Sequence, residues 1–153
     1  MSAVLRDLGL LVPAFRERRD LVETAMTARG HHYVTNETLR SLERSAQLVK
    51  EGTSQVSGGP SMHCYGIAED GRCGHHGWDC AKHECDFFEA LHQEVLKVGL
   101  TRVRLTNKKT GVKYWDQPHM QAIPVSMQPL IRSAAREHID TLVRSLFAGL
   151  VPR

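Results

Sequence analysis

The sequence contains no apolar run long enough to span a bilayer, so a membrane-spanning helix is excluded. It has no C-x-x-C pair, the usual ligand spacing of zinc fingers. Aromatic residues make up only 6% of the chain and are not interleaved with a basic patch. The formal net charge of +3 is too small to indicate a nucleic acid as partner, although it suits an anionic one. What remains is a chain of 153 residues, enough for a single domain with one core over residues 1–153.

The first twelve residues also lack the features of a secretory signal. They contain one arginine and a short apolar run, but no A-x-A-like cleavage site. We therefore expect the protein to be made in the cytoplasm, and any action outside the cell to require release by another component.

Cysteine is confined to one short stretch, at Cys64, Cys73, Cys80 and Cys85. An even count fits disulfides, but the missing export signal favours thiols. Three interpretations stay open: free thiols around a loop, disulfides formed after release, or a second, structural zinc held by Cys73, Cys80, Cys85 and one histidine.

The pattern of apolar and turn residues predicts helices and short strands. Residues 13–29 are predicted to form a helix, because Pro13 suits a first turn and Gly30 suits the end. Asn36 is predicted to cap a second helix that runs to about residue 51. The remaining predictions are strands at 31–35, 62–69, 101–105, 112–115 and 119–123, loops at 53–60 and 70–84, a turn at 107–111, a helix from a capping box at Asp86 to Gly99, and an amphipathic helix over 128–149. The fold class is α+β, a small and mostly antiparallel sheet packed by helices.

Two short motifs together supply the donors of one zinc site. Residues 61–70 read S-x-H-x-Y-G-x-A-x-D and contain His63 and Asp70, and residues 115–119 read W-D-x-P-H and contain Asp116 and His119. Two imidazoles and one carboxylate leave an open position for water, and a second carboxylate stands beside them. A catalytic zinc site needs this set of ligands together with a base.

The spacing of the first motif requires a bend. His63 and Asp70 are seven residues apart, and an odd separation in a flat strand points two side chains to opposite faces. Both can bind one metal only if the backbone turns between them, which Gly66 allows, and the small Ala68 leaves room beside the site. The alternative is that His63 caps a loop and Asp70 begins a turn.

Two further residues are candidates for catalysis. Asp116 is the candidate general base, since a carboxylate beside an activated water can take its proton and pass it to the leaving amine. Arg40 is the candidate electrophile, because a guanidinium can hold a substrate carboxylate or a developing oxyanion. The alternatives are that Asp116 is a turn residue before Pro118 and that Arg40 is a solvated residue on a helix.

These motifs resemble those of the zinc D-alanyl-D-alanine carboxypeptidase and L-alanyl-D-glutamate endopeptidase family, which includes phage endolysins. Further likeness lies in Val12-Pro13-Ala14-Phe15-Arg16, in the R-S-x-E…Q-L…G-T segment from Arg40 to Thr53, and in Phe88 to Leu100, so it covers about residues 10–123. The chain departs from the family pattern at Cys64, Gly71, Thr101-Arg102-Val103 and Met120.

The resemblance implies a carboxypeptidase- or hedgehog-like fold with zinc held by His63, Asp70 and His119. Asp116 would be the base and Arg40 would lie near the substrate, the peptidoglycan stem peptide. An aspartate at the base position resembles the endopeptidase branch, which cuts between L-Ala and D-Glu. The expected setting is a phage endolysin or a virion component that acts on the cell wall.

Two other functions compete with this one. The chain could keep fold and metal without chemistry, as a zinc-stabilised structural or wall-binding module of a phage particle. It could also be a nucleic-acid binder built on the Cys/His loop, which the absent C-x-x-C pairs and basic patch argue against.

Overall fold

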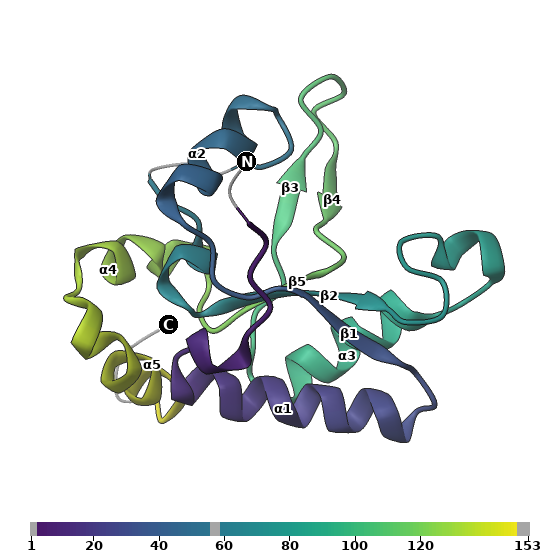
Figure 1. Ribbon diagram of the computed structural model, residues 1–153, viewed down its shortest axis with the longest axis horizontal. Helices are drawn as coiled ribbons and strands as arrows, with labels where there is room; N and C mark the ends of the chain where they lie inside the picture. The colour runs from purple at the N-terminus through teal and green to yellow at the C-terminus, as the bar shows by residue number, and fades with distance from the viewer. Residues whose placement is uncertain (1–2, 56–58, 150–153) are drawn as a thin grey trace.

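A computed structural model describes residues 3–55 and 59–149 and has the predicted α+β class (Figure 1). Within these ranges, no helix is long and apolar enough to cross a bilayer. The helices are α1 (Pro13–Ala28), α2 (Leu42–Lys50), α3 (Phe87–Lys97), α4 (Gln128–Ser133) and α5 (Ile139–Phe147). The strands are β1 (Tyr33–Glu37), β2 (Ala68–Cys73), β3 (Arg104–Thr106), β4 (Lys113–Trp115) and β5 (His119–Gln121), and short 3₁₀ turns span Leu8–Leu10, Met62–Tyr65, Cys80–His83, Val125–Met127 and Arg136–His138.

The main sheet is antiparallel, in the order β1-β2-β5, with β2 in the middle. Its register places Asp70 of β2 opposite Glu37 on one side and His119 on the other. Strands β3 and β4 form a separate hairpin that extends away from this sheet (Figure 1). Residues directly opposite one another in neighbouring strands share a face, so three polar side chains line up across the sheet.

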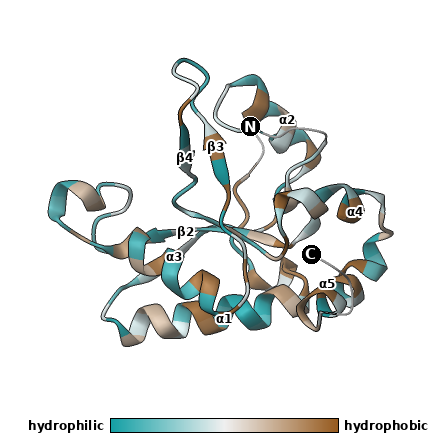
Figure 2. Cartoon of the chain, turned by 180° about the vertical axis from the view of Figure 1, so that it is seen from behind, coloured by the Kyte–Doolittle hydropathy of each residue, from teal (hydrophilic) through white to brown (hydrophobic). Residues whose placement is uncertain are grey.

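Helices α1 and α3 lie on one side of the sheet, and α2 and the hairpin lie on the other (Figure 1). Along α1 and α3 the buried residues recur at helical spacing, so each helix packs one mainly apolar face on the core. Figure 2 shows hydrophobic and hydrophilic residues alternating along both helices. The buried faces of the two helices form much of the core, with fully buried Phe15, Val22, Met26, Phe87, Leu91 and Val95. The predicted start of α1 at Pro13 is confirmed.

A buried ion pair ties α1 to the central strand. Arg19 Nε donates to Glu69 Oε2 at 2.7 Å, and Tyr33 and Thr35 donate their hydroxyl protons to Glu69 Oε1. Since side chains alternate along a strand, Glu69 faces α1 while Asp70, the next residue, faces the opposite side. The helical layer therefore holds β2 from below and leaves its other face free for a site.

Several predicted boundaries were wrong. Asn36 does not cap a helix, because β1 pairs with β2 as far as Glu37. Helix α2 begins later, after Ser41, whose Oγ accepts the Arg44 N–H at 3.1 Å. The strand predicted at 62–69 begins at Ala68 and continues to Cys73, because pairing with β1 extends it into the predicted loop.

Three smaller corrections concern the second half of the chain. Asp86 stands at the start of α3 but forms no capping hydrogen bond; its carboxylate lies 3.2 Å from His31 Nε2 instead. The strand predicted at 101–105 is β3, shifted to 104–106, and Thr101 forms a single bridge with Gln121. Strand β5 ends at Gln121 rather than at residue 123. Part of the loop predicted at 53–60, residues 56–58, lies outside the described residues.

The single C-terminal helix predicted over 128–149 is divided in two. Ala134 and Ala135 adopt extended backbone angles, so α4 ends at Ser133 and α5 starts at Ile139. The break lets α5 pack against α1, where Asp140 Oδ1 accepts the Ala14 N–H at 2.7 Å. That carboxylate satisfies an otherwise unpaired donor in the first turn of α1. Tertiary contacts thus outweigh a continuous helical pattern.

We predict that Gly66→Ala destabilises the protein more than Gly111→Ala. Both glycines have positive φ, +68° and +70°, which costs an alanine about 1–2 kcal/mol. A Cβ at Gly66 would also lie 2.8 Å from the Leu10 backbone oxygen, whereas one at Gly111 would meet nothing within 4 Å. Urea unfolding should therefore give a loss of about 1 kcal/mol for Gly111→Ala and at least twice that for Gly66→Ala. Equal losses would contradict the close approach at Gly66.

Candidate metal centre

Three side chains from distant parts of the chain meet on the free face of the sheet. His63 comes from the Met62–Tyr65 turn, Asp70 from β2 and His119 from β5. His63 Nε2 lies 3.2 Å and His119 Nδ1 lies 3.1 Å from Asp70 Oδ1, and the two nitrogens are 3.2 Å apart. The sequence predicted this proximity. We call the three residues the His–Asp–His group.

Local backbone geometry brings the group together. Gly66 adopts a left-handed conformation directly after the turn that carries His63, which provides the predicted bend before β2. Asp70 and His119 are opposite residues of the β2–β5 ladder. A register slip by one residue would turn one of them to the other face, so strand pairing and the bend together determine the group.

Hydrogen bonds assign a tautomer to each imidazole. His63 Nδ1 lies 2.9 Å from the Thr38 backbone oxygen, which can only accept, so Nδ1 carries the proton and Nε2 presents a lone pair. His119 Nε2 lies 3.0 Å from Gln121 Oε1. The Gln121 amide nitrogen donates to the Ile123 backbone oxygen at 2.6 Å, so its Oε1 is the acceptor and His119 Nδ1 presents the lone pair.

This donor set fits a divalent metal. Two imidazole lone pairs and a carboxylate oxygen, all within 4.8 Å of one another, face a common point. Both histidines have acceptors on their outer nitrogens, as metal-binding histidines usually do. Three acceptors this close repel one another unless protons or a cation lie between them. Two nitrogens and one oxygen match zinc, with a fourth position left for solvent.

The charges in the group reinforce one another. Although burial alone would raise it, the pKa of Asp70 is held well below its usual range by the charges and hydrogen bonds of His63 and His119. Burial alone would lower the pKa of His119, but Asp70 and Asp116 raise it. The site therefore favours an ionised carboxylate with positive charge beside it, supplied either by protonated imidazoles or by a metal ion bound to their neutral tautomers.

Arg40 lies in the wall of the same cavity, but it is not an isolated cation. Its guanidinium is paired with Glu37, and Nη2 lies 3.7 Å from Asp70 Oδ2. Arg44 Nε also donates to Glu37, at 2.7 Å. Glu37 thus orients both arginines, a role that the sequence analysis missed. Its place in the same short segment as Arg40 and Arg44, with the opposite charge, was the available signal.

Asp116 lies in the same cavity, in the connection between β4 and β5. Its backbone N–H donates to the Val103 backbone oxygen at 2.9 Å, and its backbone oxygen accepts the backbone N–H of His119 at 3.3 Å. Burial and the negative charge of Asp70 raise the pKa of Asp116, against the opposing charges of His119, His63 and Arg40. A carboxylate with a raised pKa is a stronger base, and the same group can donate the proton once it has taken it up.

The cavity has a volume of about 580 Å³. The His–Asp–His group, Arg40 and Asp116 lie in its wall, so the structure brings together all five residues predicted for the main site. Other walls come from α2, β3 and the start of α4, including Arg44, Leu48, Arg104, Leu105 and Gln128.

The cysteines lie elsewhere. Cys73, Cys80 and Cys85 form a second group of their own, outside the cavity wall. Cys64 is buried, with its Sγ 3.8 Å from the Ser41 oxygen. All four are free thiols.

The fold has a counterpart among solved structures. The crystal structure of the Serratia marcescens L-Ala D-Glu endopeptidase ChiX aligns over 84% of this chain and 94% of its own, with a TM-score of 0.52 and 20% identity. At this identity the likeness shows the fold. No family model matches the chain, and a search of curated proteins finds no match.

We predict that Gln121 strengthens zinc binding through His119. Gln121→Met removes the acceptor for His119 Nε2 and should weaken zinc binding 10–100-fold, as losses of such outer partners typically do. Gln121→Glu keeps an oxygen acceptor and should bind zinc nearly as tightly as the unchanged protein. Both variants lose the hydrogen bond to Ile123. A difference between their zinc affinities, measured by competition with a chromophoric chelator, therefore reports on the oxygen acceptor for His119 Nε2 alone. Equal affinities in the two variants would contradict this role.

Proposed function

We propose that this protein is a zinc-dependent peptidase that hydrolyses the stem peptide of bacterial peptidoglycan, at the bond between L-Ala and D-Glu. The observation that carries the proposal is the convergence of two correctly oriented imidazole lone pairs and a carboxylate beside a second carboxylate, in one cavity. The fold shared with an L-Ala D-Glu endopeptidase supports the choice of substrate.

His63, Asp70 and His119 would hold the zinc ion. When bound, zinc supplies the Lewis acid that acidifies the attacking water and polarises the scissile carbonyl. Thr38 and Gln121 keep the two imidazoles in the tautomers that this binding needs. Their effect is to preorganise the ligands before metal arrives.

Asp116 would act first as base and then as acid. It takes the proton of the attacking water and delivers it to the departing amine. Burial raises the pKa of its carboxyl group, which makes the carboxylate a stronger base for the first step of this cycle. The hydrogen bond between its backbone oxygen and the His119 N–H keeps it beside the ligands.

The arginines of the cavity fit an anionic peptide. Arg40, Arg44 and Arg104 lie in its wall, and the stem peptide carries free carboxylates. A guanidinium has more N–H groups than Arg40 uses on Glu37, so it can also meet a substrate carboxylate. We infer that Arg40 both steadies Asp70 and helps to bind substrate. Because the motifs resemble those of phage endolysins, we also propose that the enzyme reaches the cell wall either after release from the host cell or as part of a virion.

The central test is hydrolysis of peptidoglycan by zinc-loaded protein. New amino groups should appear, and mass analysis should find fragments that end in L-Ala and others that begin with D-Glu. Release of free D-Ala would instead show a carboxypeptidase. If neither product exceeds the background of His63→Ala, the proposed function is wrong.

We predict that Asp116→Asn separates chemistry from metal binding. The amide cannot accept the water proton, so the rate of hydrolysis should fall at least 100-fold, the usual range for a lost general base. Zinc content should stay at the level of the unchanged protein, whereas His63→Ala should lose activity and metal together. A zinc-stabilised module without catalytic activity would not hydrolyse peptidoglycan even before the substitution. If Asp116→Asn hydrolyses peptidoglycan at the unchanged rate, Asp116 is not the general base.

A further inference from the structure

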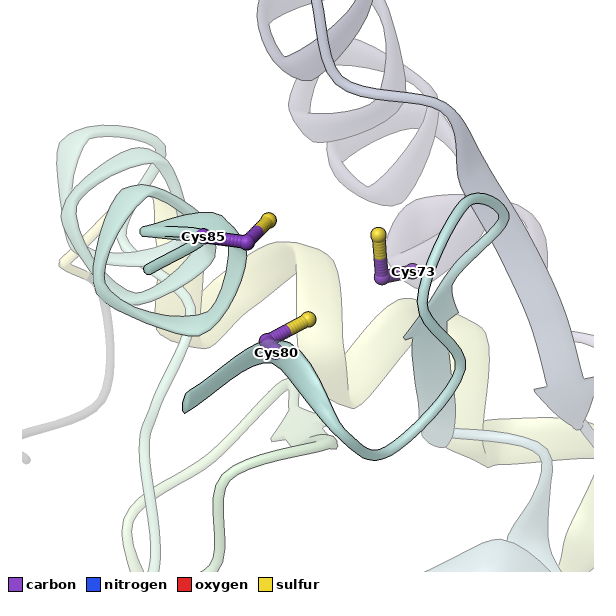
Figure 3. Close-up of side chains that lie close together, drawn as sticks. All are labelled: Cys73, Cys80 and Cys85. Atoms are coloured by element: carbon purple, nitrogen blue, oxygen red, sulfur yellow. The ribbon is translucent and has the colours of Figure 1, made fainter. Parts of the chain in front are cut away.

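A second group of metal-binding side chains lies at the far end of β2. Cys73 ends β2, Cys80 begins the Cys80–His83 turn, and Cys85 stands two residues before α3. Their sulfurs lie within 4.8 Å of one another, and Figure 3 shows them facing a shared space. Cys73 and Cys80 are buried and Cys85 is half-buried.

The separation of these sulfurs suits a metal ion better than a disulfide. Zinc–sulfur bonds of about 2.3 Å in a tetrahedron place sulfurs about 3.8 Å apart, which the observed spread allows with small side-chain movements. A disulfide would use only two of the three thiols, whereas one metal ion can bind all three.

The loop between these cysteines has almost no core of its own. Within residues 74–84 Cys80 is the single buried residue, and the others are exposed or half-buried. The segment extends from the body of the molecule beyond β2 (Figure 1). A loop of this kind buries too little apolar surface to stay ordered unaided, and small metal-bound segments solve this problem through the ion.

The backbone is already arranged to present the three sulfurs. The Gly77 N–H donates to the Cys73 oxygen at 2.8 Å, with Gly77 at a φ of +57°. The Cys85 N–H donates to the Cys80 oxygen at 3.0 Å. Glu84 between them has a φ of +52°, the one positive value at a non-glycine among the described residues. Such strain persists where surrounding interactions hold it.

A metal ion binds the thiolate form of cysteine and displaces the thiol proton outright. A largely buried group of three thiols can therefore be held together by one bound cation.

We propose that Cys73, Cys80 and Cys85 bind a structural zinc ion through their thiolates, and that this ion fastens residues 73–85 to the sheet and to α3. This site is separate from the His–Asp–His group and does not depend on the proposed hydrolysis. It also has a consequence for the cavity. Trp78 of this loop stacks on Phe88 of α3, with ring centroids 6.2 Å apart and planes within 4°, and forms part of the cavity wall. The ion would therefore hold one side of the cavity in place.

We predict two zinc ions per chain in protein prepared with reductant and zinc and without chelator. Native mass spectrometry should find two in the unchanged protein, one in Cys73→Ser, one in His63→Ala and none in the double variant. Cobalt substitution adds a signature specific to sulfur. Thiolate-to-cobalt charge-transfer absorption should appear in the unchanged protein and in His63→Ala, and should be lost in Cys73→Ser.

Cys64→Ser is the matched control, because Cys64 is also buried but lies outside the group, and it should keep the charge-transfer absorption. Since the cobalt spectrum of the unchanged protein is informative by itself, the test does not depend on the folding of Cys73→Ser. A single zinc that His63→Ala removes, with no charge-transfer band, would overturn the proposal. So would a disulfide that forms within the group and persists under reductant.

Discussion

The position of one carboxylate, Asp70, determines the rest of the site. It lies on the middle strand of a three-stranded sheet, with Glu37 opposite on one neighbour and His119 opposite on the other. One of its oxygens meets His63 and His119, and Arg40 approaches the other. Strand register thus sets the distances among Glu37, Asp70 and His119, and the bend at Gly66 brings His63 to them. Sites built on strands in this way are held more rigidly than sites built on loops.

The opposite face of the same strand explains how such a charged site is tolerated. Glu69 is fully buried against α1, and its charge is matched by Arg19 and by two hydroxyl donors. Removing one partner of a buried pair leaves an uncompensated charge and is costly. The ion pair between Arg19 and Glu69 therefore holds β2 against α1. The upper face of β2 is free to gather groups whose charges require a cation.

The sequence predicted the fold class, the start of α1 and the meeting of the His–Asp–His group, because residue types and the bend at Gly66 are local signals. It did not predict the acceptors on the two imidazoles. The Thr38 acceptor is a backbone oxygen, which no side-chain pattern reveals, whereas Gln121 stands two residues after His119 on the same strand face and could have been inferred. The break at Ala134 has no local signal, since it follows from the packing of α5 on α1. Zinc binding and catalysis stay predictions.

The most direct test of this account is the assignment of each imidazole tautomer by long-range ¹H–¹⁵N NMR during a zinc titration. We expect His63 to keep its proton on Nδ1 while its Nε2 resonance shifts, and His119 to keep its proton on Nε2 while its Nδ1 resonance shifts. Unchanged ring resonances after zinc addition, or shifts at the two opposite nitrogens, would contradict this expectation.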